Sequence, residues 1–168
     1  MNPNLDFGEQ CQVVSGFLPA DMNSGAGAGD WVSLKNYEKL TIVFFKGAGT
    51  ATQDPTVQLI QGKTSAGGTP LALDVIDRIY VKQNTVLTAE GTFTLRTQTA
   101  DQDFVGDATS AEEAGLYIID IYAEDLADEY EFVQASVANV GANPQLGCIL
   151  YFLWPPRYGE QTLLSAIA

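Results

Sequence analysis

The chain has 168 residues, enough for one domain with a sizeable core; 46% of them are hydrophobic and only 17% are charged. Its net charge of -13 at pH 7 would repel a phosphate backbone, which argues against direct nucleic-acid binding. No apolar stretch approaches the roughly 20 residues of a membrane span, and the opening MNPNLDFGEQ lacks the pattern of a signal peptide, so we expect neither membrane insertion nor export.

The acidic residues are unevenly placed. Residues 101–131 contain eleven Asp and Glu and no Lys or Arg, whereas seven of the eight basic residues lie between Lys35 and Arg96. Such a run is usually a solvated face, and we favour that interpretation. The alternative is an acidic patch that docks on a basic partner or collects cations.

The first thirty residues predict a loose arm over 1–9, a strand over 10–17 (QCQVVSGF) and a loop over 18–30 (LPADMNSGAGAGD). The glycine- and alanine-rich loop has little capacity to pack. It is either a flexible linker or an exposed loop that orders on a partner. Order resumes at Trp31 and leads into the next strand.

Residues 39–46 predict a central strand. Leu40, Ile42 and Phe44 alternate along one face, and Val43 and Phe45 along the other. Because successive strand residues face opposite ways, two apolar faces require cover on both sides. A turn (GAGTATQDP) separates this strand from a second one over 56–61, and the pair needs a further sheet to pack against.

Five more strands are expected, over 71–82 (as one strand or two short ones), 92–97, 116–122, 130–137 and 148–153. In the second of these, Phe93 and Leu95 alternate with threonines, which indicates a half-exposed strand. Residues 100–115 read as an acidic loop, in which Ser110 and Glu113 have the spacing of a capping box around one helical turn.

The ending WPPRYGEQTLLSAIA departs from the strand pattern. Pro155 and Pro156 are expected to stop the preceding strand and impose an extended path. The apolar LLSAIA then either folds back over the core of its own domain or forms an arm that packs on a neighbouring subunit.

About eight short strands with turn-rich loops and no long helix predict an all-β fold, an antiparallel β-sandwich with a jelly roll as the favoured topology. The expected organisation is an N-terminal arm over 1–9, the sandwich over 10–153 and an extended C-terminal arm over 154–168.

Catalytic and metal-binding signals are weak. The chain has no histidine, which removes the usual general base, and zinc has almost no ligands. A carboxylate-based glycosidase stays open in principle, and Asp101, Asp103 and Asp107 lack the glycine and glutamate of an EF-hand loop. Cys11 and Cys148 read as buried free thiols, although a bridge forms if the first and last strands place them together. We expect no enzyme, no cofactor and no metal.

Three stretches, GAGAGDWVSLKNYEKLTIVFFKGAGTATQDPTVQLIQG, EAGLYIIDIYAEDL and LYFLWPPRYGEQTLLSAIA, resemble a group of small structural proteins of tailed bacteriophages, from about residue 24 to the end. The resemblance implies a virion component, a cement (decoration) protein on the exterior of the head, assembled in the host bacterial cytoplasm. It further implies a homotrimer at threefold or quasi-threefold axes that binds the major capsid protein. It carries no catalytic motif.

Contacts with partners are expected from the 18–30 loop and from the 154–168 ending. The candidate interface residues are Trp31, Trp154, Pro155, Pro156, Tyr158, Leu163, Leu164 and Ile167. The alternatives are a tail, neck or fibre-associated virion protein, or a carbohydrate- or receptor-binding β-sandwich that uses exposed aromatic side chains.

Overall fold

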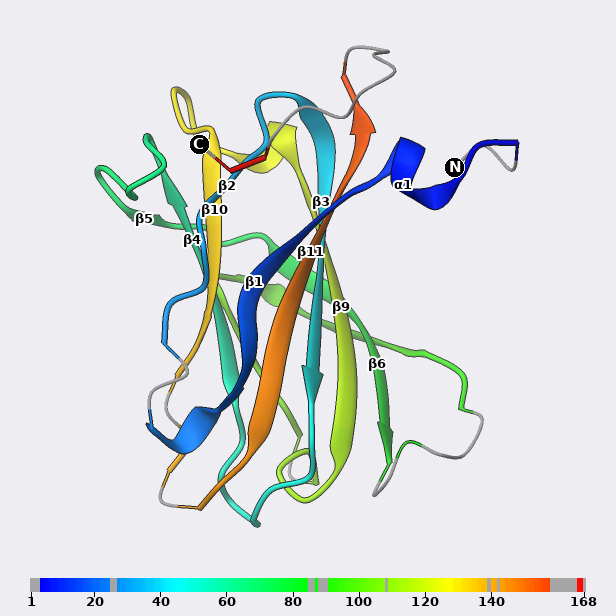
Figure 1. The fold of residues 1–168 in the computed structure, drawn as a ribbon. Coiled ribbons are helices and arrows are strands. Elements are labelled where there is room, and N and C mark those ends of the chain that lie inside the picture. Colours follow the sequence, from blue (N-terminus) through cyan, green and yellow to red (C-terminus); the bar gives the residue numbers. More distant parts are fainter. Residues whose placement is uncertain are drawn as a thin grey trace.

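The computed structural model describes residues 4–24, 27–84, 87, 91–107, 109–138, 140–141, 143–157 and 166–167. Two antiparallel sheets pack face to face, so the predicted all-β sandwich is confirmed (Figure 1). One sheet has the strand order β1 (Gln12–Asp21), β11 (Leu146–Pro156), β3 (Tyr37–Lys46), β9 (Ala114–Tyr122), β6 (Ile76–Asn84) and β7 (Thr94–Asp101). The jelly-roll topology stays a prediction.

The second sheet has the order β2 (Val32–Ser33), β10 (Phe132–Val137), β4 (Thr56–Gly62) and β5 (Leu71–Ala72), and β8 (Asp103–Val105) also pairs with β4. The helical elements are one turn or less: α1 (Phe7–Gln10), η1 (Met22–Ser24) and η2 (Ala123–Asp125). The eight predicted strands correspond to β1, β3, β4, β6, β7, β9, β10 and β11. Within the predicted range 71–82 the structure has two strands, β5 and β6, which is the second of the two forms expected there. The two strands that the sequence pattern misses, β2 and β8, have two and three residues, too few for a periodic pattern.

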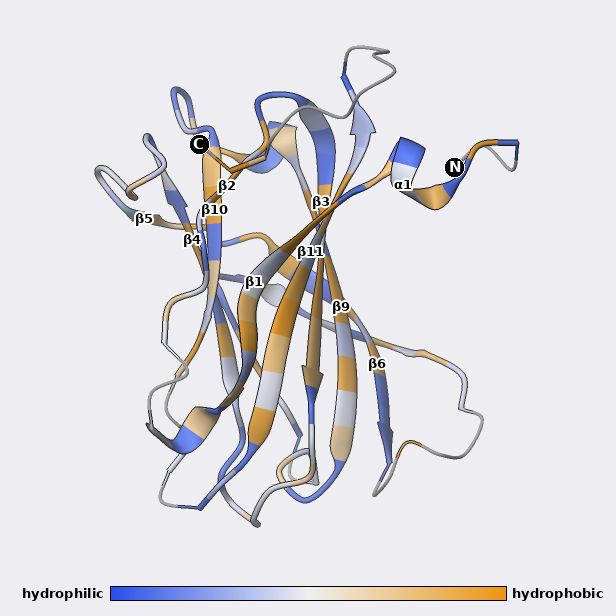
Figure 2. Ribbon diagram, viewed as in Figure 1, coloured by the Kyte–Doolittle hydropathy of each residue, from blue (hydrophilic) through white to orange (hydrophobic). Residues whose placement is uncertain are grey.

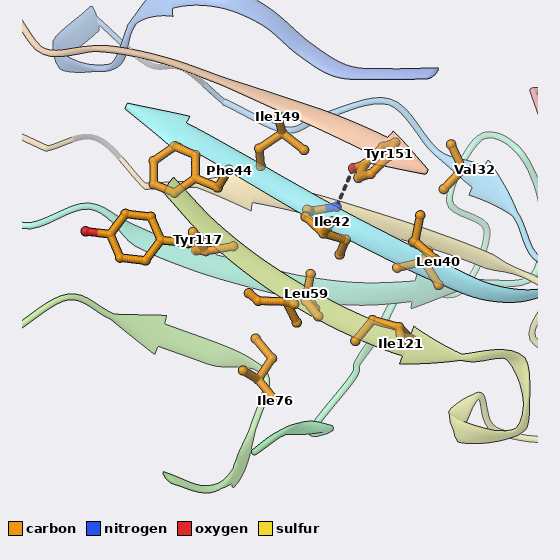
Figure 3. Packing of buried hydrophobic residues seen from close by; sticks show 14 of the residues in the cluster. Val32, Leu40, Ile42, Phe44, Leu59, Ile76, Tyr117, Ile121, Ile149 and Tyr151 are labelled. Atoms are coloured by element: carbon orange, nitrogen blue, oxygen red, sulfur yellow. Dashed lines mark hydrogen bonds between the residues drawn. The ribbon is translucent and has the colours of Figure 1, made fainter. Parts of the chain in front are cut away.

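The core lies between the two sheets and follows from strand alternation. On β3, Leu40, Ile42 and Phe44 are fully buried, and β4 contributes Leu59 from the opposite sheet (Figure 3). The hydroxyl of Tyr151 on β11 accepts a hydrogen bond of 2.8 Å from the backbone N–H of Ala135 on β10. This bond joins the sheets and satisfies a buried donor, which would otherwise be costly.

The predicted loop over 18–30 is partly wrong, because β1 continues to Asp21. Its pairing with β11 shifts register twice and then resumes, with Ala20 opposite Gly147. The second of these shifts, between Phe17 and Ala20, spans Pro19, which the sequence pattern treats as a strand breaker. Met22, assigned to a segment with little capacity to pack, is fully buried.

The prediction that the prolines stop the last strand is also wrong. β11 runs on through Trp154, Pro155 and Pro156, and Pro156 lies opposite Tyr37 of β3. Proline is tolerated there because the strand is at its end and few ladder donors are required. The backbone N–H of Arg157 still donates to the carbonyl of Asn36 at 2.8 Å.

The described part of the C-terminal end folds back on its own domain. Ala166 is buried, and its carbonyl accepts a hydrogen bond of 2.9 Å from the N–H of Ser33 in β2. For residues 166–167 the structure therefore favours an ending that folds back over the core of its own domain, rather than an arm on a neighbouring subunit. The division of the chain into an N-terminal arm over 1–9, a sandwich over 10–153 and a C-terminal arm over 154–168 stays a prediction.

The acidic segment over 100–115 is not all loop, because β8 pairs its residues with β4. The helical turn proposed at Ser110 does not form. Ser110 is fully buried in a turn instead; its hydroxyl donates to the carboxylate of Asp54, and its carbonyl accepts from the ammonium group of Lys46.

Candidate functional site

The side of the six-stranded sheet that points away from the core is the most distinctive surface of the described chain. We call it the outer face. Strand register places one row of side chains straight across it, running through β1, β11, β3, β9, β6 and β7: Ser15, Leu150, Val43, Ile118, Tyr80 and Leu95. A second row continues from Cys148 through Phe45 and Leu116 to Lys82.

The outer face is apolar and largely uncovered. Six of its large apolar side chains each expose 38–48% of their surface: Val13, Phe45, Tyr80, Phe93, Leu95 and Leu150. Figure 2 shows the central strands β11, β3 and β9 coloured mainly as hydrophobic, whereas the loops at both ends of the sandwich are mostly hydrophilic. A continuous apolar surface of this kind marks a contact site more often than a chance exposure.

This finding corrects one sequence prediction. The second face of the strand over 39–46 is not covered by another layer, and the side chain of Phe45 lies half exposed. Phe93 and Leu95 also lie on the outer face, because Leu95 is registered opposite Tyr80 and the inward position next to it belongs to Arg96. The sequence pattern predicts the alternation along this strand but not which of its two sides is covered.

A groove of about 310 Å³ lies at one end of the outer face. Its lining comes from α1, the start of β1 and the strands β3, β9 and β11: Phe7, Cys11, Lys39, Thr41, Val43, Ile118, Asp120, Phe152 and Trp154. The ring of Phe7 meets that of Phe152 edge to face, with 6.0 Å between centroids. The short helix α1 therefore forms one wall of the groove.

A small polar network fixes the floor of this groove. The ammonium group of Lys39 lies 2.7 Å from the carboxylate of Asp120 and 4.7 Å from the ring centroid of Trp154. Thr41 donates its hydroxyl to Asp120 at 2.6 Å and accepts from the indole N–H of Trp154 at 3.2 Å. The network satisfies each of these polar groups and holds the Trp154 ring against the sheet.

The outer face is poor in acidic groups. The registered rows of this face carry four charged side chains, Lys39, Arg78, Lys82 and Asp120, of which the first and last pair with each other. A further acidic residue, Asp77, is exposed beside Arg78 at the irregularity in β6. The ammonium group of Lys82 lies over the ring of Phe93, at 5.6 Å. For a chain of net charge -13, this surface carries few unpaired acidic groups.

The predicted interface residues do not form one site. Trp154 lies in the groove, and Pro155 and Pro156 follow it in β11. Trp31 belongs to another region, where its ring packs closely on the backbone of Gly62 and Gly67. Ile167 is half exposed beside the buried Ala166. Tyr158, Leu163 and Leu164 lie outside the described residues. The interface role of all eight stays a prediction.

The outer face was missed by sequence reasoning, although a signal for it exists. Strands over 39–46 and 148–153 are apolar on both faces. This pattern indicates either a central strand buried on both sides or an exposed apolar surface that binds a partner. The central strand predicted over 39–46 corresponds to the first of these interpretations. Phe45 and Leu150 belong to the second.

The two cysteines are free thiols. Their strands are neighbours, but the antiparallel register puts them at opposite ends: Gln12, next to Cys11, is opposite Leu153, whereas Gly147, next to Cys148, is opposite Ala20. Burial raises the pKa of Cys11 to about 11, so this thiol is a poor nucleophile at neutral pH.

The acidic residues considered for calcium are committed to protein contacts. Asp103 accepts from the amide of Gln58 at 3.0 Å, and Asp107 pairs with Arg96. Burial opposes ionisation of Asp107, but hydrogen bonds from Gln83 and Thr109 and the charge of Arg96 lower its pKa. Within the described residues, no group of three or more His, Cys, Asp or Glu is placed to hold a metal ion.

Comparisons with known proteins give little further guidance. No protein-family model matches the chain, and no curated protein matches it at a significant level. Among solved structures, the SPBc2 prophage-derived protein YomS is similar with a TM-score of 0.42 and 12% identity, over 84% of this chain and 92% of that one. A likeness at this level carries no inference about function. In the described part of the chain, no helix has the length and apolar character needed to cross a membrane.

Proposed function

We propose that the chain is a non-catalytic cement (decoration) protein of a tailed-bacteriophage head. It binds the major capsid protein on the outside of the shell, as a homotrimer at threefold or quasi-threefold axes, and stabilises the head. The resemblance of three sequence stretches to small phage structural proteins supports the class, and the surface of the sandwich supports a role in protein contacts.

The observation that carries the proposal is the uncovered apolar outer face. A rigid sheet that presents aliphatic and aromatic side chains in registered rows suits a protein–protein contact, because burial of apolar surface drives such association. Small-ligand sites, in contrast, are usually concave and enclosed. The groove beside Trp154 is open and lies at the margin of this face, so it extends the contact surface.

The charge of the chain supports the exterior of the head. A protein of net charge -13 is repelled by packaged DNA, whereas the outside of a filled shell imposes no such penalty.

The test is binding of the purified protein to emptied phage heads, by sedimentation followed by cryo-electron microscopy of the pellet. We expect density on the outer shell at threefold or quasi-threefold positions, and heads with bound protein should withstand higher temperature than bare heads. Absence of binding would contradict the cement role and favour a tail, neck or fibre location. A glycan array then tests the carbohydrate-binding alternative.

A further inference from the structure

We infer that the outer face of the six-stranded sheet binds a second copy of this chain. The inference rests on the proposed role of this face as a protein–protein contact and specifies its partner. The contact would leave the second sheet and the loops at the ends of the sandwich free to meet the shell.

The exposed area matches what a stable association between subunits needs. The six large side chains named above, at 38–48% exposure, present of the order of 450 Å² of apolar surface. A standard interface buries about 800 Å² per partner, a little over half of it non-polar, which is again about 450 Å². The outer face thus supplies the apolar part of one complete interface.

The geometry of the face suits an extended protein surface. Strand register aligns Leu150, Val43 and Ile118 in one row that continues to Tyr80 and Leu95, so no backbone ridge interrupts it. Sheets stack with about 10 Å between them when such side chains interdigitate. In a homotrimer this face meets a different surface of the next copy, because a ring of three closes only through head-to-tail contacts.

The charge distribution selects this face for contact between copies. Two molecules of charge -13 repel each other, and the repulsion is smallest where acidic groups are fewest. On the outer face, Asp120 is already paired with Lys39, Arg78 has the exposed Asp77 beside it, and Lys82 adds positive charge. Contact through this face keeps the acidic segments of the two copies apart.

The solubility of the free protein also favours association between copies through this face. A cement protein exists free in solution before a shell is available to bind. An uncovered apolar patch of this size on a free monomer favours non-specific aggregation. Association with identical copies covers the patch without any other component.

The experiment measures the oligomeric state of the full chain by sedimentation velocity and light scattering. The test variants are Phe45→Asp, Leu150→Asp and Tyr80→Asp, which place charge at three half-exposed positions of the outer face. The matched control is Val105→Asp on β8, a more exposed position that belongs to the second sheet. Circular dichroism and thermal melting verify that each variant is folded.

We expect the wild type and Val105→Asp to form the same closed oligomer. The three outer-face variants should associate at least roughly tenfold more weakly, since each buries a charge in the contact. A monomeric wild type, or an oligomer that all three folded variants retain, would overturn the inference.

Binding to emptied heads separates this inference from the proposed function. A wild-type monomer that binds heads, with binding lost in Phe45→Asp, would assign the outer face to the capsid protein; the cement role would stand and the inference would fail. An oligomer that depends on the outer face but does not bind heads would support the inference and contradict the cement role.

Discussion

Gly16 of β1 lies where the packing leaves no room for a side chain. A Cβ atom there would come within 2.4 Å of Cγ2 of Ile149 and 2.9 Å of Cζ of Tyr151. Both neighbours are fully buried and belong to the adjacent strand β11. The glycine therefore permits close contact between the first and last strands, and the sequence alone gives no reason to expect it.

Gly16→Ala should lower the free energy of unfolding by about 1–3 kcal/mol, because the added methyl group overpacks the core. Gly47→Ala is the matched control, since the nearest atom to its Cβ is the carbonyl oxygen of Leu146 at 3.7 Å. The control should change stability by less than about 0.5 kcal/mol. Urea denaturation measures both, and equal losses in the two variants would contradict the packing argument.

Lys46 is a second residue whose surroundings matter, because they determine its pKa. Its side chain is fully buried, and its ammonium group donates to the carbonyl oxygens of Ser110 and Glu113. Burial lowers its pKa to about 8, against the opposing effect of the carboxylates of Asp54, Glu113 and Glu112. The unfolded chain should titrate near the ordinary lysine value of about 10.4.

Between pH 8 and about 10, the unfolded state binds more protons at Lys46 than the folded state does, so this residue makes stability rise with pH. Cys11, whose pKa is raised to about 11, acts in the opposite direction above pH 9. The variant Lys46→Met retains Cys11. The free energy of unfolding of the wild type minus that of this variant therefore isolates the contribution of the lysine. We expect that difference to grow as pH rises from 8; denaturant titrations at several pH values measure it, and a constant difference would contradict a lowered pKa.

At the scale of elements, the C-terminal end is held to the sandwich by short-range contacts. Ala166 packs in the core cluster, and its carbonyl accepts from the N–H of Ser33. A truncation after residue 162 therefore removes a core contact. Such a truncation does not separately test an arm that packs on a neighbouring subunit, because the sandwich itself loses stability.

Ala166→Asp should destabilise the domain by several kcal/mol, since it places a carboxylate at a buried position without a partner. Ile167→Asp is the matched control because the adjacent side chain is half exposed, and it should cost less than about 1 kcal/mol. Thermal unfolding of both variants provides the measurement. Equal and small effects would indicate that the end is not docked on its own domain.

At the scale of the whole molecule, apolar attraction and acidic repulsion oppose each other. The outer face favours association between copies, whereas a net charge of -13 acts against it over long distances. Salt screens the repulsion, since the Debye length falls from about 30 Å at 0.01 M to about 3 Å at 1 M. Added salt does not weaken apolar contacts between the copies.

Association should therefore tighten as sodium chloride is raised from 0.01 M to about 0.5 M. Sedimentation velocity across this range gives the dissociation constants. Phe45→Asp serves as the control and should remain largely monomeric throughout. If salt weakens association of the wild type instead, the contact is held by ion pairs between copies and the apolar face is not its main component.

Much of the architecture follows from local pattern. The alternation of Leu40, Ile42 and Phe44 predicts a strand with a buried side, and eight such patterns without a long helix predict the sandwich. These signals are local because the geometry of a strand fixes the direction of each side chain relative to its neighbours. Composition likewise determines the net charge and the absence of histidine chemistry.

The tertiary structure decided which apolar surfaces are covered. The period-2 alternation predicts that Phe44 and Phe45 point in opposite directions. Whether either side chain is covered depends on residues that are far away in the chain. The same holds for Phe93 and Leu95, for Pro156 opposite Tyr37 and for Ala166 beneath β2. The sequence by itself determined the class of fold and the charge, whereas long-range strand pairing, which no local pattern encodes, decided that one face of the six-stranded sheet is left open.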